Sequence, residues 1–280
     1  MIDKKFEPPP EKRKTIIQIS ILFALIFLFF CYDIHDDLNI LVENNIFPVQ
    51  KPPPDILLLI VKIDLQYLLC LPLFILLIRL VFKHTFKEAG FIFNKESYLF
   101  IGLSVVAVSL IVFLGKVLSV WNNSSMVILI GNVITCFFLV GFMEELIFRG
   151  FIFNRLLKFV NGKRSFLFAV LTSAALFSLV HAPLLLGDMV RLFAALSFTF
   201  LFGIWAAVYY FYSRNIIGCV VVHGMNNIIF DITNIRFSGI FGLICYYTFW
   251  VIVIAYTMMK VKKNDFNEIL KLHLINLQTI

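Results

Sequence analysis

The sequence predicts an all-α protein, a polytopic membrane protein with about eight transmembrane helices in one bundle. Hydrophobic residues make up 61% of the 280 residues and charged residues only 15%. Soluble domains are roughly half apolar and a quarter charged, so this composition argues strongly against a soluble enzyme. Disorder and a disulfide-rich secreted module are also excluded, because the chain is long and apolar and its five cysteines lie inside apolar runs.

The spans are predicted from apolar runs of sufficient length. A bilayer core about 30 Å thick requires about 20 mostly apolar helical residues. The runs that meet this requirement are 15–34, 58–82, 97–120, 126–150, 165–182, 192–212, 215–231 and 238–259. The second and seventh runs match least well, and the second contains Lys62 and Asp64 near its start.

Basic residues predict the orientation of these spans. With eight spans, the segments on the side of the N-terminus hold most of the Lys and Arg residues, whereas the first loop on the other side is acidic, with Asp33, Asp36, Asp37 and Glu43. Positive charge marks the cytoplasmic side of membrane proteins, so both termini are expected in the cytoplasm. The net charge of +7 is therefore assigned to membrane topology, and no nucleic-acid partner is expected.

Four parts are predicted along the chain. Residues 1–14 form a cytoplasmic N-terminal tail, residues 15–125 the N-terminal transmembrane helices, residues 126–259 a transmembrane core and residues 260–280 a cytoplasmic amphipathic tail. The last part is expected to lie on the inner membrane surface. Its apolar residues fall near one helical face: Phe266, Ile269, Leu270, Leu274 and Leu277.

Charged groups inside the spans are costly in hydrocarbon and are therefore candidate functional residues. In the run Glu144-Glu145-Leu-Ile-Phe-Arg149, Glu145 and Arg149 are four residues apart and can pair along one helix face. This pairing leaves Glu144 without a local cation and makes it a candidate general base. The alternative is that all three residues only anchor the helix at the inner interface.

Two histidines also lie in apolar helices. His181 follows Phe177 by one helical turn, and His223 precedes Asn227 by the same spacing. Taken alone, His181 could be a structural histidine, and the second pair could be an interhelical hydrogen bond that holds helices together. One carboxylate and two imidazoles on three helices converge only if the bundle builds a polar interior site.

These three motifs together resemble a known family, the intramembrane CAAX-protease and bacteriocin-processing proteins, also called the abortive-infection family and related to the type II CAAX prenyl endopeptidases. The motif EExxxR is Glu144-Glu145-Leu-Ile-Phe-Arg149, FxxxH is Phe177-Ser-Leu-Val-His181, and HxxxN is His223-Gly-Met-Asn-Asn227. The resemblance covers about residues 126–231 and makes the core at 126–259 a CAAX-protease-like catalytic region.

The resemblance implies hydrolysis of a peptide bond near the inner face of the bilayer. Glu144 and His181 would activate a water, and His223 and Asn227 would stabilise the oxyanion. Glu145, Arg149 and Phe177 would support these residues.

A metal-independent mechanism without a cofactor is expected. The chain contains no HExxH motif of the kind found in zinc-dependent membrane proteases. One Glu and two His side chains could nevertheless bind zinc and leave one position open for water, so a zinc site at Glu144, His181 and His223 is the alternative.

The expected partners are the lipid bilayer and a membrane-associated peptide or lipoprotein-like substrate, prenylated or not. A different class of function is a membrane protein without proteolytic activity that confers bacteriocin immunity or scaffolds envelope signalling. A transporter with Glu144 in a proton relay is disfavoured, because the two halves of the sequence show no inverted repeat. The Phe-rich composition and short loops suggest the plasma membrane of a prokaryote.

Overall fold

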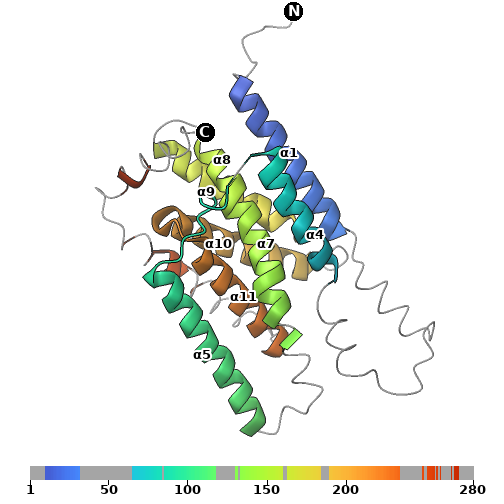
Figure 1. Ribbon diagram of the computed structural model, residues 1–280, viewed down its shortest axis with the longest axis vertical. Coiled ribbons are helices and arrows are strands. Elements are labelled where there is room, and N and C mark those ends of the chain that lie inside the picture. Colours follow the sequence, from blue (N-terminus) through green and yellow to red (C-terminus); the bar gives the residue numbers. More distant parts are fainter. Residues whose placement is uncertain are drawn as a thin grey trace, which may run out of the picture. The chain divides into compact units, whose positions relative to one another are not determined.

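The computed structural model describes residues 10–31, 65–83, 85–117, 130–131, 133–159, 163–183, 189–233 and scattered positions from 248 to 270, and their regular elements are all helical (Figure 1). The predicted first outer loop, the N-terminal tail up to residue 9 and most of the predicted span at 238–259 lie outside the described residues. The chain divides into two compact units. The first unit comprises Met1–Tyr32, Phe151–Tyr212 and Leu243–Ile280, and the second comprises Asp33–Gly150 and Ser213–Gly242.

The second unit contains helices from three separate stretches of sequence. In chain order they are α4 (Leu65–Leu76), the π-helical η2 (Leu77–Val81), α5 (Lys95–Val117), the π-helical η3 (Ile134–Gly141), α7 (Phe142–Glu145), the start of the π-helical η4 (Leu146–Phe153) and α11 (Ile216–Thr233). Helix α11 packs against η3, α5 and α7, and α4 also contacts η3 and α7.

The first unit contains α1 (Pro10–Cys31), α8 (Asn154–Leu157), α9 (Lys163–Leu179) and α10 (Met189–Ser213). Small residues let α9 and α10 approach closely, because a Cβ added to Gly203 would lie 3.0 Å from Cα of Ala174. The hydroxyl of Ser178 also donates to the carbonyl of Leu196 at 2.7 Å. From the C-terminal tail, Phe266 packs on the ring of Phe166 at a centroid distance of 5.3 Å.

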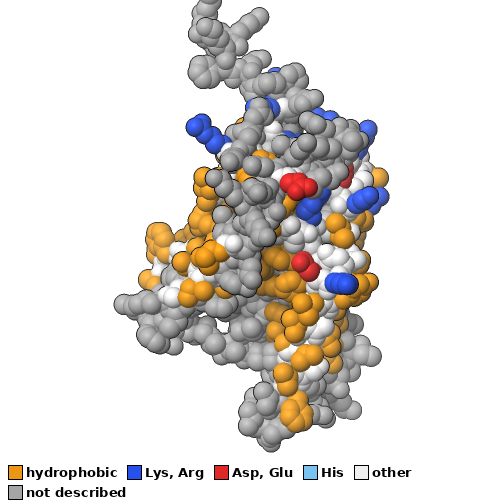
Figure 2. All heavy atoms as spheres, turned by 90° about the vertical axis from the view of Figure 1, so that its left-hand side faces the viewer, with side chains coloured by type: hydrophobic (Ala, Val, Ile, Leu, Met, Phe, Trp, Pro, Cys, Tyr) orange, Lys and Arg blue, Asp and Glu red, His pale blue; other side chains and the backbone are white. Residues whose placement is uncertain are grey.

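Apolar side chains cover the outer faces of the helices in both units. On α4, Leu69 is 58% and Leu73 64% exposed, and on α5, Leu99 is 60% and Phe113 61% exposed. Figure 2 shows continuous stretches of such side chains on the face that it draws. Exposed apolar area of this extent marks contact with lipid or a partner rather than with water.

Length and hydropathy together select few of the described helices as candidate membrane spans. Among the described residues, one helix, Leu192–Ser213, is long and apolar enough to cross a bilayer, with a mean hydropathy of 1.9. The shorter apolar helices are Tyr67–Val81, Arg164–Leu179 and Ile216–Ile228. All of these helices lie within predicted spans, to within a few residues at each end.

Glycines let η3 and α11 approach each other closely in the second unit. A Cβ on Gly141 would lie 3.2 Å from the carbonyl oxygen of Val220, and a Cβ on Gly224 would lie 2.7 Å from Cδ1 and 3.1 Å from Cα of Phe137. Without a side chain, both positions let the two backbones pack closely. Because His223 precedes Gly224 and Glu144 and Glu145 follow Gly141 within one turn, this crossing brings the polar residues of the two helices together.

Adding one methyl group at this crossing should loosen the second unit. Gly224→Ala is expected to lower the free energy of unfolding in detergent by about 1 to 3 kcal/mol, because the new Cβ overlaps Phe137. Gly102→Ala on α5 is the matched control, since a Cβ there meets nothing within 4 Å, and it should be neutral or stabilising by about 0.5 to 1 kcal/mol. Equal unfolding free energies for the two variants would contradict the close crossing.

A polar junction joins the starts of α5 and α11. Asn94 caps α5 by accepting from the Ser97 amide at 2.9 Å, and Asn215 caps α11 by accepting from the Ile217 amide at 3.0 Å. The Asn215 side chain also donates to the Ser97 hydroxyl at 2.8 Å and to Asn94 Oδ1 at 3.2 Å. One amide side chain therefore fixes the register of the helix that carries His223.

Candidate active site

The carboxylates of the EExxxR motif lie on α7, a four-residue α-helical stretch with π-helical stretches on both sides. Glu144 is 1% exposed and Glu145 is fully buried. The sequence predicts regular α-helical geometry for this motif, whereas the structure has wider, π-helical turns before and after it. π-helical stretches are rare and frequently occur at functional sites.

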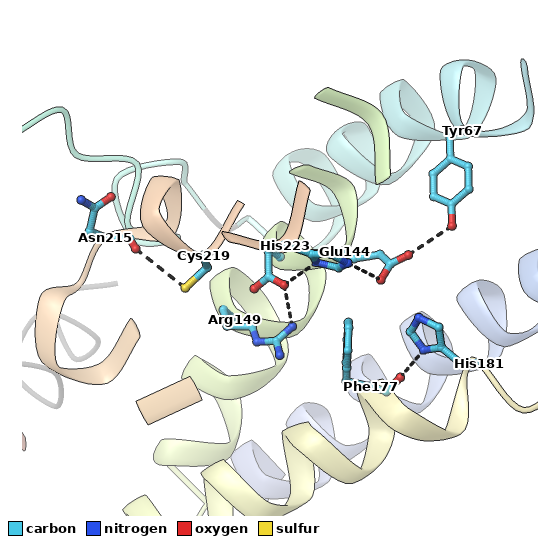
Figure 3. A network of polar contacts seen from close by, with 9 residues as sticks. Tyr67, Glu144, Arg149, Phe177, His181, Asn215, Cys219 and His223 are labelled. Atoms are coloured by element: carbon cyan, nitrogen blue, oxygen red, sulfur yellow. Dashed lines mark hydrogen bonds and ion pairs between the residues drawn. The ribbon is translucent and has the colours of Figure 1, made fainter. Parts of the chain in front are cut away.

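The predicted pair of Glu145 and Arg149 is confirmed. Arg149 Nη1 donates to Glu145 Oε1 at 2.9 Å, and both side chains are at most 1% exposed (Figure 3). Two buried charged side chains are tolerated only when each compensates the other, and this pair supplies that compensation inside an apolar helix bundle.

His223 binds the same carboxylate from α11. Its Nδ1 lies 2.8 Å from Glu145 Oε1, and its Nε2 lies 3.7 Å from Glu144 Oε2. A carboxylate only accepts hydrogen bonds, so Nδ1 carries the proton in the shorter contact, and this contact fixes the orientation of the ring. Glu145 therefore holds Nε2 on the side of Glu144, as the orienting acid does in a carboxylate–histidine pair.

Tyr67 on α4 completes the cluster, and it was missed from the sequence. Its hydroxyl donates to Glu144 Oε1 at 3.1 Å, and its side chain is 8% exposed. Charged residues and histidines stand out in an apolar run, whereas a tyrosine does not. The structure thus brings together Tyr67, Glu144, Glu145, Arg149 and His223 within the second unit.

Phe177 lies on α9 and His181 in the turn that follows it, and both belong to the first unit. The predicted relation between them is confirmed, because their rings are 4.9 Å apart and His181 Nδ1 lies 2.8 Å from the carbonyl oxygen of Phe177. A carbonyl oxygen only accepts, so His181 Nδ1 carries the proton in this contact.

The i,i+4 spacing of His223 and Asn227 does not produce a hydrogen bond between them. His223 turns its ring to the carboxylates instead, while Asn227 is half-buried and its side chain has no hydrogen-bond partner among the described residues. The sequence spacing placed both groups on one helix face, but the carboxylate of Glu145 is the stronger acceptor for the imidazole.

The described residues contain no group of three or more His, Cys, Asp or Glu side chains arranged to hold a metal ion. The zinc alternative combined Glu144 and His223 of the second unit with His181 of the first. The contacts given above are hydrogen bonds and ion pairs between groups of the same chain.

Helical structure, lipid-facing apolar surfaces and a buried acid–histidine cluster define a helical membrane protein with an internal polar site. Comparison with known families agrees with this class. Residues 126–229 match the family of Rce1-like type II CAAX prenyl endopeptidases, and this part of the chain is an Rce1-like domain of that family. No curated protein and no solved structure matches the chain.

Proposed function

We propose that the protein is an intramembrane endopeptidase that hydrolyses a peptide bond of a membrane-associated peptide or protein near the cytoplasmic face. The observation that carries this proposal is the buried cluster of Glu144, Glu145 and His223, which lies inside the Rce1-like domain. Burying two acids beside an imidazole is costly for a purely structural role, and such clusters mark functional sites in membranes.

In the proposed reaction, Glu144 takes a proton from water, with His181 as the second group that orients it. The hydroxide oxygen attacks the carbonyl carbon of the scissile peptide bond, and the carbonyl oxygen becomes an oxyanion. Glu144 then returns the proton to the departing amine as the carbon–nitrogen bond breaks. General acid–base catalysis of this kind contributes typically about 10² to 10⁴ in rate.

His223 and Asn227 are proposed to donate to the oxyanion. With Nδ1–H held by Glu145, a protonated His223 presents Nε2–H as a donor. The Asn227 amide, not engaged by other described side chains, supplies the second donor. Donors fixed before the reaction stabilise the oxyanion without reorganisation.

The proposed chemistry uses no metal and no cofactor, and the proposed topology has eight spans in the plasma membrane with both termini in the cytoplasm. The exposed apolar faces of α1, α4 and α5 support contact with lipid on these helices. The substrate is proposed to be a membrane-associated peptide, and the experiment below distinguishes lipidated from unlipidated substrates.

The test is cleavage of a mixed panel of lipidated and unlipidated membrane peptides by the purified protein in detergent, with and without a zinc chelator. Cleavage that continues with chelator and is absent in Glu144→Gln supports the glutamate mechanism. Loss of wild-type cleavage with chelator would replace it by a metal site. A cellular phenotype lost on deletion of the protein but kept by Glu144→Gln would favour the immunity or scaffold function over the peptidase.

A further inference from the structure

Tyr67 reaches the candidate base from outside the family domain. It lies on α4 (Leu65–Leu76), well before residues 126–229, and is 77 residues from Glu144 along the chain. Figure 3 shows its ring directed from α4 toward the Glu144 carboxylate. The hydrogen bond of 3.1 Å between them joins two helices of the second unit, and α4 also packs directly against α7.

The contact limits how the Glu144 carboxylate can turn. Tyr67 engages Oε1, while Oε2 lies on the side of His223 Nε2 at 3.7 Å. The terminal torsion of a glutamate side chain is broad and weakly restrained, so a donor on one oxygen decides where the other oxygen points. A phenol hydroxyl suits this position, because it donates to the carboxylate and remains neutral at physiological pH.

We propose that Tyr67 is a positioning residue that holds the Glu144 carboxylate in the orientation needed for proton transfer. The inference rests on the proposed function, and it assigns part of the active site to the N-terminal helices. Tyr67 touches Glu144 and acts through it, so its removal should alter the rate of the chemical step and leave substrate binding intact.

The first experiment measures the bond without using activity. The unfolding equilibrium in detergent is compared for the wild type, Tyr67→Phe, Glu144→Ala and the double variant. In the wild-type background, Tyr67→Phe is expected to raise the unfolding equilibrium constant about tenfold, the usual effect of losing a hydrogen bond to a charged group. In the Glu144→Ala background the same change should be less than about threefold, because the acceptor is already gone. Equal effects in both backgrounds would overturn the proposal.

The second experiment measures catalysis on the peptide cleaved by the wild type. Tyr67→Phe is expected to lower kcat by about 10- to 100-fold, the cost of a misplaced catalytic group, with KM unchanged. Two controls separate this effect from general damage. Tyr98→Phe removes the hydroxyl of a tyrosine that is 64% exposed, and Tyr210→Phe removes a buried one that accepts from Asn154 at 2.8 Å.

Both controls should keep the kcat of the wild type, even where Tyr210→Phe lowers stability. An unchanged kcat in Tyr67→Phe, or an equal loss in Tyr210→Phe, would overturn the positioning role. The failure of the proposed function has a different signature, since Glu144→Gln would then cleave as the wild type does while the coupling of Tyr67 to Glu144 in the unfolding cycle persisted.

Discussion

Replacement of Glu144 by Gln is expected to lower the rate of peptide hydrolysis by about 10² to 10⁴, the usual contribution of a general base. The amide cannot take a proton from water, yet it keeps the shape of the side chain and an oxygen that can accept from Tyr67. The fold should therefore survive while the chemistry is lost. The measurement is kcat on the peptide that the wild type cleaves, together with the detergent unfolding curve of both proteins.

The matched control is Glu96→Gln, which neutralises an exposed carboxylate on α5 in the same unit. It should retain full activity, because charge removal at the surface leaves the site unchanged. A Glu144→Gln protein that folds and cleaves at the wild-type rate would refute the assignment of Glu144 as the base.

Replacement of Arg149 by Met is expected to destabilise the protein by about 3 to 5 kcal/mol. Methionine fills most of the volume but leaves Glu145, which is fully buried, without its cation. Removing one partner of a buried ion pair destabilises a protein by more than the intact pair stabilises it. The charge that remains has neither solvent nor a partner. The free energy of unfolding in detergent measures this effect.

Two further variants make the result specific to the buried charge. Lys95→Met removes an exposed cation at the start of α5 and should change the stability by less than about 0.5 kcal/mol. Adding Glu145→Gln to Arg149→Met should recover part of the loss, because the side chain that has lost Arg149 is then neutral. If the double variant is as unstable as the sum of the two single ones, the loss comes from packing and not from charge.

Local features of the site were predictable from the sequence. The bond between Glu145 and Arg149 follows from a spacing of four residues, and so do the contacts of Phe177 with His181. The same holds for the helices, because long apolar runs between charged segments determine where a membrane chain can be helical.

Contacts between distant residues were not predictable in the same way. The bond of His223 to Glu145 spans 78 residues and depends on the close crossing at Gly141 and Gly224. No periodicity reports which helices pack together or at which residues. Tyr67 was missed for this reason, since an apolar run gives no information on which of its side chains will face a buried acid.

The two kinds of contact at Glu145 also differ in when they can form. As the chain is synthesised, the ion pair with Arg149 needs only one turn of helix, whereas the bond to His223 must wait for 78 further residues. The local pair can therefore compensate the acid while α9 and α10 are still being made. Without it, the Glu145 carboxylate would have no charged partner until α11 had been made. Arg149 thus acts on the nascent chain as well as on the finished protein.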